Sequence, residues 1–396
     1  MARVGIYGGS FNPPHVGHVR AVQDAKRYLR LDAVLVIPAA IPPHKALAEG
    51  SPDGDTRLRL TELAFAGLEG FSVSDLELRR EGASYTVDTL RQLRQERPDD
   101  DLVLLMGTDM LLSFDTWREP GEICKMAELA CFSRYEDAKM QAALAEKELL
   151  LEQQFGTEVT LVPNDCVEIS STEIRRLLFF GCSGAYLQPA VLEEIRKLGL
   201  YGTAENCRNL PFAELKAVSL RLHKEKRVPH VLGCEELASV LAERYGVDAE
   251  AARRAAILHD VTKALTASQQ LQFCRQYGIE LTEFEKEQTQ LLHAITAAKA
   301  AECLFGESPA VCSAIRWHTT GKTDMTGLEK IIYIADMVEK TRCYPGVDAI
   351  REALSRDLDT GVMQGLERTI RHLQENGCAV APESLQALRF LRAERM

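Results

Sequence analysis

The hydrophobic positions of this 396-residue chain follow two different periods, and the change falls near residue 205. Before that point, short runs of β-branched and aliphatic residues alternate with stretches in which apolar residues recur three and four positions apart. These patterns predict strands, for example at 34–37, 102–106 and 159–162, and helices, for example at 57–68, 86–95 and 138–154. Strands that alternate with helices in this way predict a parallel sheet with helices on both faces.

The second half contains no convincing strand pattern. From Phe212 to the end, apolar residues recur at helical spacing, interrupted by glycines at positions 246, 278, 306, 321 and 377. The interruptions predict an all-α bundle of about eight helices. A chain of this length also exceeds one ordinary hydrophobic core. We therefore expect two domains, residues 1–203 and 212–396, joined by the polar segment 204–211.

Composition and charge narrow the class of protein. The content of 46% apolar and 27% charged residues is typical of soluble globular proteins. The net charge of -11 disfavours electrostatic binding to nucleic acid, which needs a basic face. No segment is apolar for long enough to cross a bilayer, and the N-terminus lacks the apolar region of a signal peptide. The 11 cysteines are odd in number and form no C-x-x-C pair, which favours reduced thiols. We expect a cytoplasmic protein that acts on small phosphorylated molecules, and we leave its oligomeric state open.

A segment rich in glycine and histidine follows the first predicted strand. It reads Gly8-Gly9-Ser10-Phe11-Asn12-Pro13-Pro14-His15-Val16-Gly17-His18. Two glycines at a strand end let the backbone approach a phosphate, and a helix that begins near Gly17 directs its free N–H groups to the same place. His15 and His18 share one face of the first turn and can donate hydrogen bonds to a triphosphate. The segment is neither a Walker A loop nor a G-x-G-x-x-G fingerprint. A turn with two surface histidines is the alternative, and the preceding strand and following helix favour phosphate binding.

A second segment has the features of an anion-binding helix start. It reads Ile169-Ser170-Ser171-Thr172-Glu173-Ile174-Arg175-Arg176. By itself, Ser170 or Ser171 predicts no more than a helix N-cap. Because Arg175 and Arg176 follow one turn inside the helix, however, hydroxyls, main-chain amides and a guanidinium can converge on one anion. This helix end complements the first one.

Residues 1–203 resemble the bacterial nicotinate-nucleotide adenylyltransferases of the nucleotidyltransferase α/β-phosphodiesterase superfamily. Further segments that carry the resemblance are Pro43-His44-Lys45, Tyr85-Thr86, Gly107-Thr108-Asp109, Trp117-Arg118 and Gly199-Leu200-Tyr201. The resemblance implies a Rossmann-like fold. It also implies the reaction of ATP with nicotinate mononucleotide to give deamido-NAD and pyrophosphate, with Mg²⁺ bridging the phosphates.

The resemblance further implies a set of site residues. Catalysis would rest on His15, His18 and Arg175. ATP would contact Gly8, Gly9, Ser10, Phe11, His15, His18, Asp109, Ile169, Ser170, Ser171 and Arg175, and nicotinate mononucleotide would contact His44, Lys45, Tyr85, Thr86 and Trp117. Without the resemblance, a residue such as Trp117 is more often part of a core, and one such as Asp109 more often starts a helix.

This reaction requires no nucleophile from the protein. The phosphate of the mononucleotide can attack the α-phosphorus of ATP in line, so catalysis comes from positioning and from neutralisation of charge. The acceptor stays open at this point, because nicotinamide mononucleotide and phosphopantetheine are alternatives.

The second half carries histidines and aspartates at intervals on predicted helices. They are His230, the pair His259-Asp260, His293, His318 and Asp336. A carboxylate on an apolar helix is costly to bury unless a cation or hydrogen-bond donors receive it. Imidazoles and carboxylates from several helices suit borderline divalent metals or iron. Any one of these histidines alone is more readily a core or surface residue, but the ordered set favours a metal centre.

This set resembles the HD-domain superfamily, and in particular the symmetrical diadenosine-tetraphosphate hydrolases. The match runs through Arg227 to His230, Leu258 to Lys263, His318 to Gly321 and Ala335-Asp336, with Thr262 departing from the usual small apolar residue. The resemblance implies one or two ions, of iron or another divalent transition metal, that activate water against a phosphoanhydride of a dinucleoside polyphosphate. It implies core ligands His230, His259, Asp260 and Asp336, a second metal or the substrate at His293 and His318, and phosphate at Lys263. The alternative is a regulatory module that binds metal and nucleotide without turnover.

Overall fold

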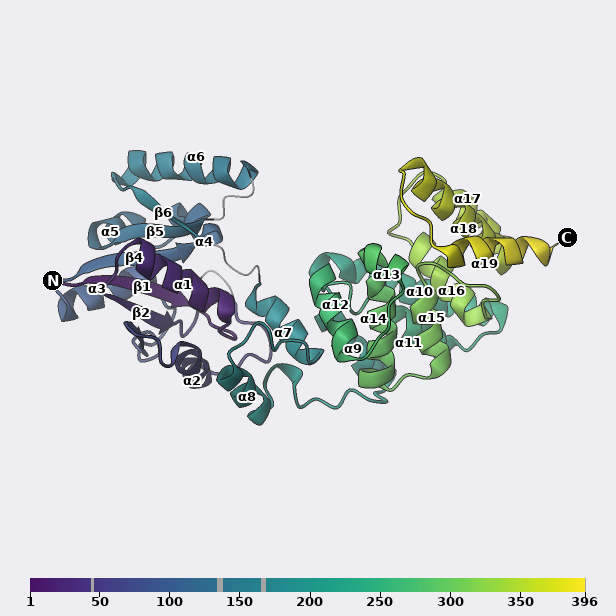
Figure 1. Cartoon of the computed structure of the whole chain (residues 1–396), viewed down its shortest axis with the longest axis horizontal. Coiled ribbons are helices and arrows are strands. Elements are labelled where there is room, and N and C mark those ends of the chain that lie inside the picture. Colours follow the sequence, from purple (N-terminus) through teal and green to yellow (C-terminus); the bar gives the residue numbers. More distant parts are fainter. Residues whose placement is uncertain (44–45, 134–137, 165–168, 396) are drawn as a thin grey trace. The chain divides into compact units, whose positions relative to one another are not determined.

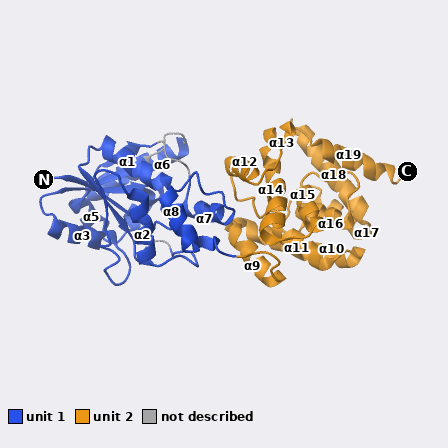
Figure 2. Ribbon diagram, turned by 60° about the horizontal axis from the view of Figure 1, so that its bottom comes forward, with its two compact units in different colours: residues 1–205 blue, residues 206–396 orange. Residues whose placement is uncertain are grey.

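The computed structural model describes residues 1–43, 46–133, 138–164 and 169–395. The chain divides into two compact units, unit 1 with residues 1–205 and unit 2 with residues 206–396 (Figure 2). Among the described residues, no helix combines the length and the apolar composition that a membrane span requires.

Unit 1 contains a six-stranded sheet in the order β3-β2-β1-β4-β5-β6, and all of its strand pairs are parallel. The strands are β1 (Arg3–Gly9), β2 (Ala33–Pro38), β3 (Phe71–Val73), β4 (Asp101–Gly107), β5 (Glu128–Ser133) and β6 (Val159–Pro163). The predicted parallel sheet is confirmed. The strand order reverses between β1 and β4, and such a switch point opens a crevice at the carboxyl ends of the strands.

Helices cover both faces of this sheet (Figure 1). They are α1 (Val16–Tyr28), α2 (Gly54–Phe65), α3 (Thr86–Glu96), α4 (Thr108–Leu112), α5 (Pro120–Met126), α6 (Ala138–Phe155), α7 (Ser171–Phe179) and α8 (Pro189–Lys197), with the 3-10 turns η1 (Phe114–Thr116) and η2 (Leu200–Gly202). Val34 and Val36 of β2 belong to the core on one face, and Leu35 and Ile37 belong to the core on the other. The alternation follows from the two-residue period of a strand.

The start of α2 differs from the predicted helix 57–68. The helix begins at Gly54, because the Asp53 carboxylate accepts a hydrogen bond from the main-chain N–H of Thr56 and caps it. It ends at Phe65, and the next residue leaves the helical conformation. The helix therefore lies one turn earlier along the chain than its apolar pattern indicates.

Unit 2 contains no strand in its described part, as predicted, but more helices than the predicted eight. The eleven α-helices among the described residues of unit 2 are α9 (Phe212–Leu222), α10 (Val228–Tyr245), α11 (Ala249–Leu258), α12 (Ala267–Gln276), α13 (Glu283–Glu287), α14 (Leu292–Ala300), α15 (Pro309–Trp317), α16 (Gly327–Val338), α17 (Val347–Arg356), α18 (Leu358–Glu375) and α19 (Pro382–Ala393). Shorter turns are η3 (Glu225–Arg227), η4 (Thr289–Leu291) and the π-type η5 (Ala301–Phe305). The predicted number was too low partly because α17 and α18 separate only at Asp357, whose extended backbone and capping carboxylate break a continuous apolar pattern.

Much of the predicted linker is hydrogen-bonded to unit 2. The main-chain N–H of Asn209 donates to the carbonyl of Phe305 at 2.8 Å, and the Arg208 guanidinium donates to the carbonyl of Cys303 at 2.8 Å. The carbonyl of Leu210 accepts from Arg254 at 3.0 Å. Residues 208–210 are therefore fixed to the helical unit.

Candidate active sites in the two units

The carboxyl ends of β1 and β4 open into a cavity of about 790 Å³ in unit 1. It lies where the strand order reverses, as expected for a ligand site in an open parallel sheet. Twelve of the predicted site residues line it, namely Gly8, Gly9, Ser10, His15, His18, Thr86, Asp109, Trp117, Ile169, Ser170, Ser171 and Arg175. Residues predicted to contact ATP and residues predicted to contact the mononucleotide therefore share one cavity.

Two of the described predicted residues, Phe11 and Tyr85, do not line this cavity. The Phe11 side chain is 1% exposed and packs against Tyr7 and His18, with ring centroids 5.6 and 5.2 Å away. This side chain therefore belongs to the core and does not face the cavity. Tyr85 precedes α3, and the Arg118 guanidinium lies 4.7 Å from the centre of its ring. His44 and Lys45 fall outside the described residues.

The loop after β1 is hydrogen-bonded to the start of α7. Arg175 Nη1 donates to the carbonyl of Asn12 at 2.6 Å, and Ser171 Oγ donates to the carbonyl of Pro13 at 2.9 Å. Ser170 caps α7 and forms a reciprocal capping box with Glu173. Two helix starts, those of α1 and α7, therefore border the same cavity. The positive end of a helix dipole favours an anion at the helix N-terminus.

His15 and His18 lie against each other at the start of α1. Their ring centroids are 3.6 Å apart, and the main-chain N–H of His15 donates to Nδ1 of His18 at 3.2 Å. Because Nδ1 of His18 accepts this bond, the neutral ring carries its proton on Nε2. Burial lowers the pKa of His15 to about 4, and burial together with His15 lowers the pKa of His18 well below its ordinary value. Without a bound anion, both imidazoles are neutral hydrogen-bond donors.

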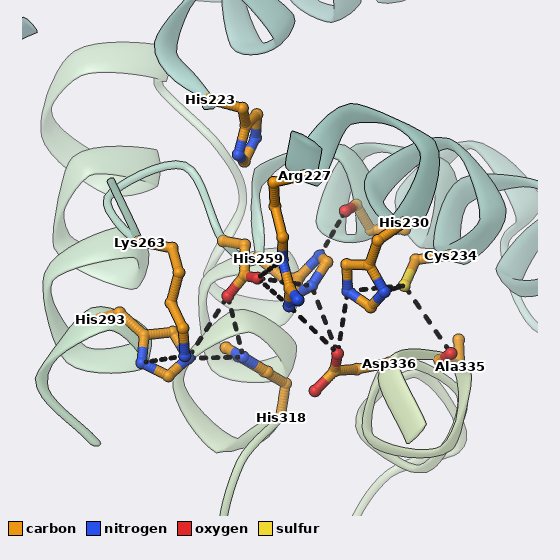
Figure 3. Close-up of polar contacts among 12 residues, drawn as sticks. His223, Arg227, His230, Cys234, His259, Lys263, His293, His318, Ala335 and Asp336 are labelled. Carbon is orange, nitrogen blue, oxygen red and sulfur yellow. Dashed lines mark hydrogen bonds and ion pairs between the residues drawn. The ribbon is translucent and has the colours of Figure 1, made fainter. Parts of the chain in front are cut away.

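The predicted metal ligands of unit 2 meet at one buried centre (Figure 3). Asp336 Oδ1 lies 3.0 Å from His230 Nε2 and 3.8 Å from His259 Nε2. Asp260 Oδ2 lies 3.6 Å from His259 Nε2. These four residues come from α10, from the end of α11 and from α16, so the fold gathers them from a span of more than a hundred residues.

A second group surrounds the other oxygen of Asp260. Asp260 Oδ1 lies 3.3 Å from His293 Nε2 and 3.7 Å from His318 Nε2, and the two imidazole nitrogens are 3.2 Å apart. Lys263 Nζ lies 2.9 Å from His293 Nε2. The carboxylate of Asp260 therefore stands between two groups of imidazoles.

Fixed acceptors set the tautomer of all four histidines in this centre. Each Nδ1 faces an acceptor and each Nε2 faces the carboxylates. The acceptors are Ala256 O for His259 (2.6 Å), Gln290 O for His293 (2.7 Å), Ile315 O for His318 (2.7 Å) and Glu339 Oε1 for His230 (3.0 Å). An imidazole that donates from Nδ1 presents a lone pair at Nε2. Four nitrogen lone pairs thus point toward Asp260 and Asp336.

The charges of the two carboxylates are balanced by side chains of the protein. Arg227 Nε donates to Asp260 Oδ2 at 2.7 Å, and Arg342 Nη2 donates to Asp336 Oδ1 at 2.6 Å. Burial alone would raise the pKa of Asp260, but the neighbouring His259 and His293 hold it below the ordinary value of an aspartate. Both carboxylates are therefore ionised, as metal ligation requires.

Residues 6–177 match the cytidylyltransferase-like family model. The probable nicotinate-nucleotide adenylyltransferase of Thermomicrobium roseum is 38% identical over 207 residues, which cover 52% of this chain and 94% of that protein. The chain belongs to the nicotinate-nucleotide adenylyltransferase family. A second member, from Exiguobacterium sibiricum, is 36% identical over 202 residues, covering 51% of this chain and 100% of that protein. These adenylyltransferases match about half of the chain.

Residues 227–341 match the HD domain family model. Among solved structures, this chain is similar to the crystal structure of a predicted HD superfamily hydrolase involved in NAD metabolism from Clostridium acetobutylicum. The sequence identity is 32% and the TM-score is 0.45, and the match covers 47% of this chain and 98% of that chain. The family-model match identifies an HD domain within unit 2 of this adenylyltransferase family member.

The HD domain implies a divalent metal, and the residues of the centre fit one. Two ligands about 2.1 Å from one ion, at angles between a right angle and the tetrahedral angle, are ~3.0 to 3.4 Å apart. The contacts of His230 with Asp336, at 3.0 Å, and of His293 with His318, at 3.2 Å, lie in this range. His259 Nε2 and Asp260 Oδ1 are buried without a hydrogen-bond partner among the described residues. Each such group costs about 1–3 kcal/mol, which a bound cation would offset.

Several residues of the sites were given no role in the prediction from sequence. Glu339 is fully buried, accepts from the main-chain N–H of Thr341 at 2.7 Å and holds His230. Arg227 and Arg342 neutralise the carboxylates, and Glu77 lines the cavity of unit 1. The position of Glu339 one turn after Asp336 was the available signal, because residues three apart share a helix face.

Acid should destabilise unit 1 through His15. Its pKa of about 4 in the folded protein lies below the 6.5 of the unfolded chain, so in acid the unfolded chain binds the proton first. Stability is therefore lost as the pH falls from about 6.5 toward 4, and between pH 7 and 5 we expect His15 alone to remove about 2 kcal/mol. The measurement is urea unfolding at both pH values, for the parent and for His15→Gln.

A single tryptophan makes this measurement specific for unit 1. The chain has two tryptophans, Trp117 in unit 1 and Trp317 in unit 2. In a Trp317→Phe background, the fluorescence of Trp117 alone reports the unfolding of unit 1. The parent should lose about 2 kcal/mol more than His15→Gln on acidification. An equal loss in both proteins would contradict the role given to His15.

Proposed function

We propose that unit 1 transfers the adenylyl group of ATP to nicotinate mononucleotide, giving deamido-NAD and pyrophosphate. The observation that carries this proposal is the cavity bordered by two helix starts, with His15, His18 and Arg175 in its wall. Membership of the adenylyltransferase family supports the choice of acceptor. We assign residues 1–203 to this activity, and 212–396 to the second one described below.

The triphosphate of ATP would lie between the starts of α1 and α7. Main-chain N–H groups and the helix dipoles attract negative charge there. His18 would donate from Nε2 to the departing pyrophosphate, and Arg175 would add a positive charge that its bond to Asn12 keeps in place. Mg²⁺ would arrive with ATP and bridge its phosphates. The phosphate of the acceptor then attacks the α-phosphorus in line, the bond to pyrophosphate breaks, and no covalent enzyme intermediate forms.

The acceptor would occupy the part of the cavity near α3 and η1. Thr86 and Trp117 line it there, and Asp109 lies at the end of β4. An indole face suits stacking with a pyridine ring. The experiment compares kcat/KM of the full chain for nicotinate mononucleotide, nicotinamide mononucleotide and phosphopantetheine. A preference for either of the last two would overturn the proposed acceptor.

We propose that unit 2 hydrolyses a dinucleoside polyphosphate, with diadenosine tetraphosphate giving two molecules of ADP. The carrying observation is the set of Nε2 lone pairs directed at two carboxylates, with His259 Nε2 and Asp260 Oδ1 buried and without a hydrogen-bond partner among the described residues. A divalent iron or another transition metal, if bound there, would supply Lewis-acid activation of water. His230, His259, Asp260 and Asp336 would hold the first ion.

The remaining polar residues favour a highly charged substrate. His293 and His318 would bind a second ion or the substrate, since both face the free oxygen of Asp260. Arg227 and Arg342 donate to the carboxylates, and Lys263 lies beside His293, so an added metal charge would make the centre cationic. A chain of four phosphates supplies the matching negative charge. Water would add across its central phosphoanhydride, and one ADP leaves on each side.

A regulatory module that binds metal and nucleotide without turnover is the alternative for unit 2. The full chain, carrying His18→Ala so that adenylyl transfer does not consume nucleotides, is loaded with iron or manganese and given diadenosine tetraphosphate. Release of ADP supports the hydrolase, and its absence with both metals overturns it. The ten described cysteines are free thiols, which fits our placement of this enzyme in the reducing cytoplasm.

A further inference from the structure

Arg57 of α2 is buried in unit 1 to an unusual degree for an arginine. The residue is 1% exposed. Burial lowers the pKa of its guanidinium from the ordinary value. Its hydrogen bonds go to main-chain carbonyls: Nη1 donates to Ser10 at 2.9 Å and to Ala39 at 2.6 Å, and Nη2 donates to Ala40 at 3.0 Å. Because burying a charged group is costly, an apolar side chain would serve packing alone better.

The three carbonyls belong to two different loops of the cavity. Ser10 follows β1 and lies in the cavity wall beside the residues placed at the phosphates of ATP. Ala39 and Ala40 follow β2, and Pro42 and Pro43 next along the chain also line the cavity. One planar guanidinium therefore joins the loop on the ATP side to a second loop after the neighbouring strand.

Further hydrogen bonds attach the second loop to the acceptor side. Ser84 Oγ accepts from the main-chain N–H of Ala40 at 2.9 Å, and the main-chain N–H of Ser84 donates to the carbonyl of Ile41 at 2.9 Å. Ser84 lines the cavity two residues before Thr86, which we place at the acceptor. On the other side, Arg175 and Ser171 hold the carbonyls of Asn12 and Pro13. Arg57 thus connects two loops, those after β1 and β2, and each is also held by other hydrogen bonds.

We infer that Arg57 is a positioning residue for adenylyl transfer, which sets the distance between the loop that holds ATP and the loop that leads to the acceptor. The inference rests on the proposed function of unit 1. In-line attack requires the acceptor phosphate within about 3–3.5 Å of the α-phosphorus, and a displacement of ~1 Å can cost about 10²-fold in rate. When Arg57 is lost, each loop keeps its own contacts with its own substrate. The rate of the transfer step should therefore fall more than the affinity for either substrate.

The experiment compares Arg57→Met with Arg94→Met in the full chain. Arg94 is the matched control, because it also donates to main-chain carbonyls, those of Met126 at 2.9 Å and Asp100 at 2.5 Å, but neither of these acceptor residues lines the cavity. KM for both substrates and the single-turnover rate are measured under conditions in which both variants are folded. We expect Arg57→Met to lower the single-turnover rate roughly 10²-fold with KM changes below about threefold, and Arg94→Met to change neither.

Arg57→Lys keeps the test decisive if Arg57→Met fails to fold. Lysine retains the positive charge but replaces the planar fork with one ammonium that ends a bond short of the guanidinium nitrogens. We expect a folded protein with a single-turnover rate reduced roughly 10-fold. Rates equal to that of the parent in the folded Arg57 variants, or an equal loss in Arg94→Met, would overturn the inference. All rates use the acceptor on which the parent is fastest. A parent that prefers another acceptor thus contradicts only the proposed substrate.

Discussion

Replacing His18 with alanine is expected to lower kcat for adenylyl transfer by on the order of 10²- to 10³-fold. The imidazole accepts the N–H of His15 at Nδ1, so its Nε2 proton is available to the departing pyrophosphate. This hydrogen bond strengthens as charge grows on the leaving group, and its loss therefore affects the transition state more than the bound ATP. The loss of the capping contact should cost only about 1 kcal/mol of stability.

Steady-state kinetics with ATP and nicotinate mononucleotide measure the effect. The fluorescence of Trp117 in the Trp317→Phe background verifies that unit 1 is still folded. Metal content and phosphoanhydride hydrolysis by the same variant provide a second control, because the described residues that form this centre all belong to unit 2. Turnover close to that of the parent would remove His18 from the reaction.

Replacing Asp260 with asparagine should remove the metal from unit 2 and abolish hydrolysis. Asp260 is fully buried and faces His259 with one oxygen and His293 and His318 with the other. Changes beyond the direct ligands of a metal commonly cost 10–100-fold in affinity. We therefore expect loss of the ligand that faces both groups to exceed ~10²-fold in metal affinity. The asparagine keeps the shape of the side chain and still accepts the bond from Arg227.

Metal content after dialysis and release of ADP from diadenosine tetraphosphate measure this effect. Glu236→Gln is the matched control, because it removes a carboxylate from the same unit at a side chain that is 63% exposed. Adenylyl transfer should be unchanged in both variants. Retention of metal by Asp260→Asn would contradict the centre, whereas metal loss without any hydrolysis by the parent would contradict only the proposed reaction.

Together the two variants separate the activities of one chain. His18→Ala should lose transfer and keep hydrolysis, and Asp260→Asn should lose hydrolysis and keep transfer. If unit 2 instead regulates unit 1, Asp260→Asn will alter the kinetics of transfer. The pair therefore distinguishes two enzymes from one enzyme with a regulatory module.

Local patterns in the sequence identified most of the secondary structure and the chemistry of both sites. The strand at 102–106 and the helix at 86–95 lie within β4 and α3, because a two-residue or a 3.6-residue period survives in the order of residues. The capping box at Ser170 is likewise a contact between residues three apart. Phe11 was interpreted less well: a residue inside a phosphate-binding motif can point into the core, and the motif alone does not indicate its direction.

The sequence by itself determined the two classes of fold, the two helix starts that we propose bind phosphate, and the histidines and aspartates able to hold a metal. Only the tertiary structure decided that Arg57 joins two loops, that Glu339 fixes the ring of His230 and that Arg227 and Arg342 neutralise the carboxylates. The reason is physical. Every residue has a main-chain carbonyl. The sequence therefore does not show which residues an arginine will contact when it donates to main-chain carbonyls. Contacts between residues more than a hundred positions apart exist only after the core has brought their helices together.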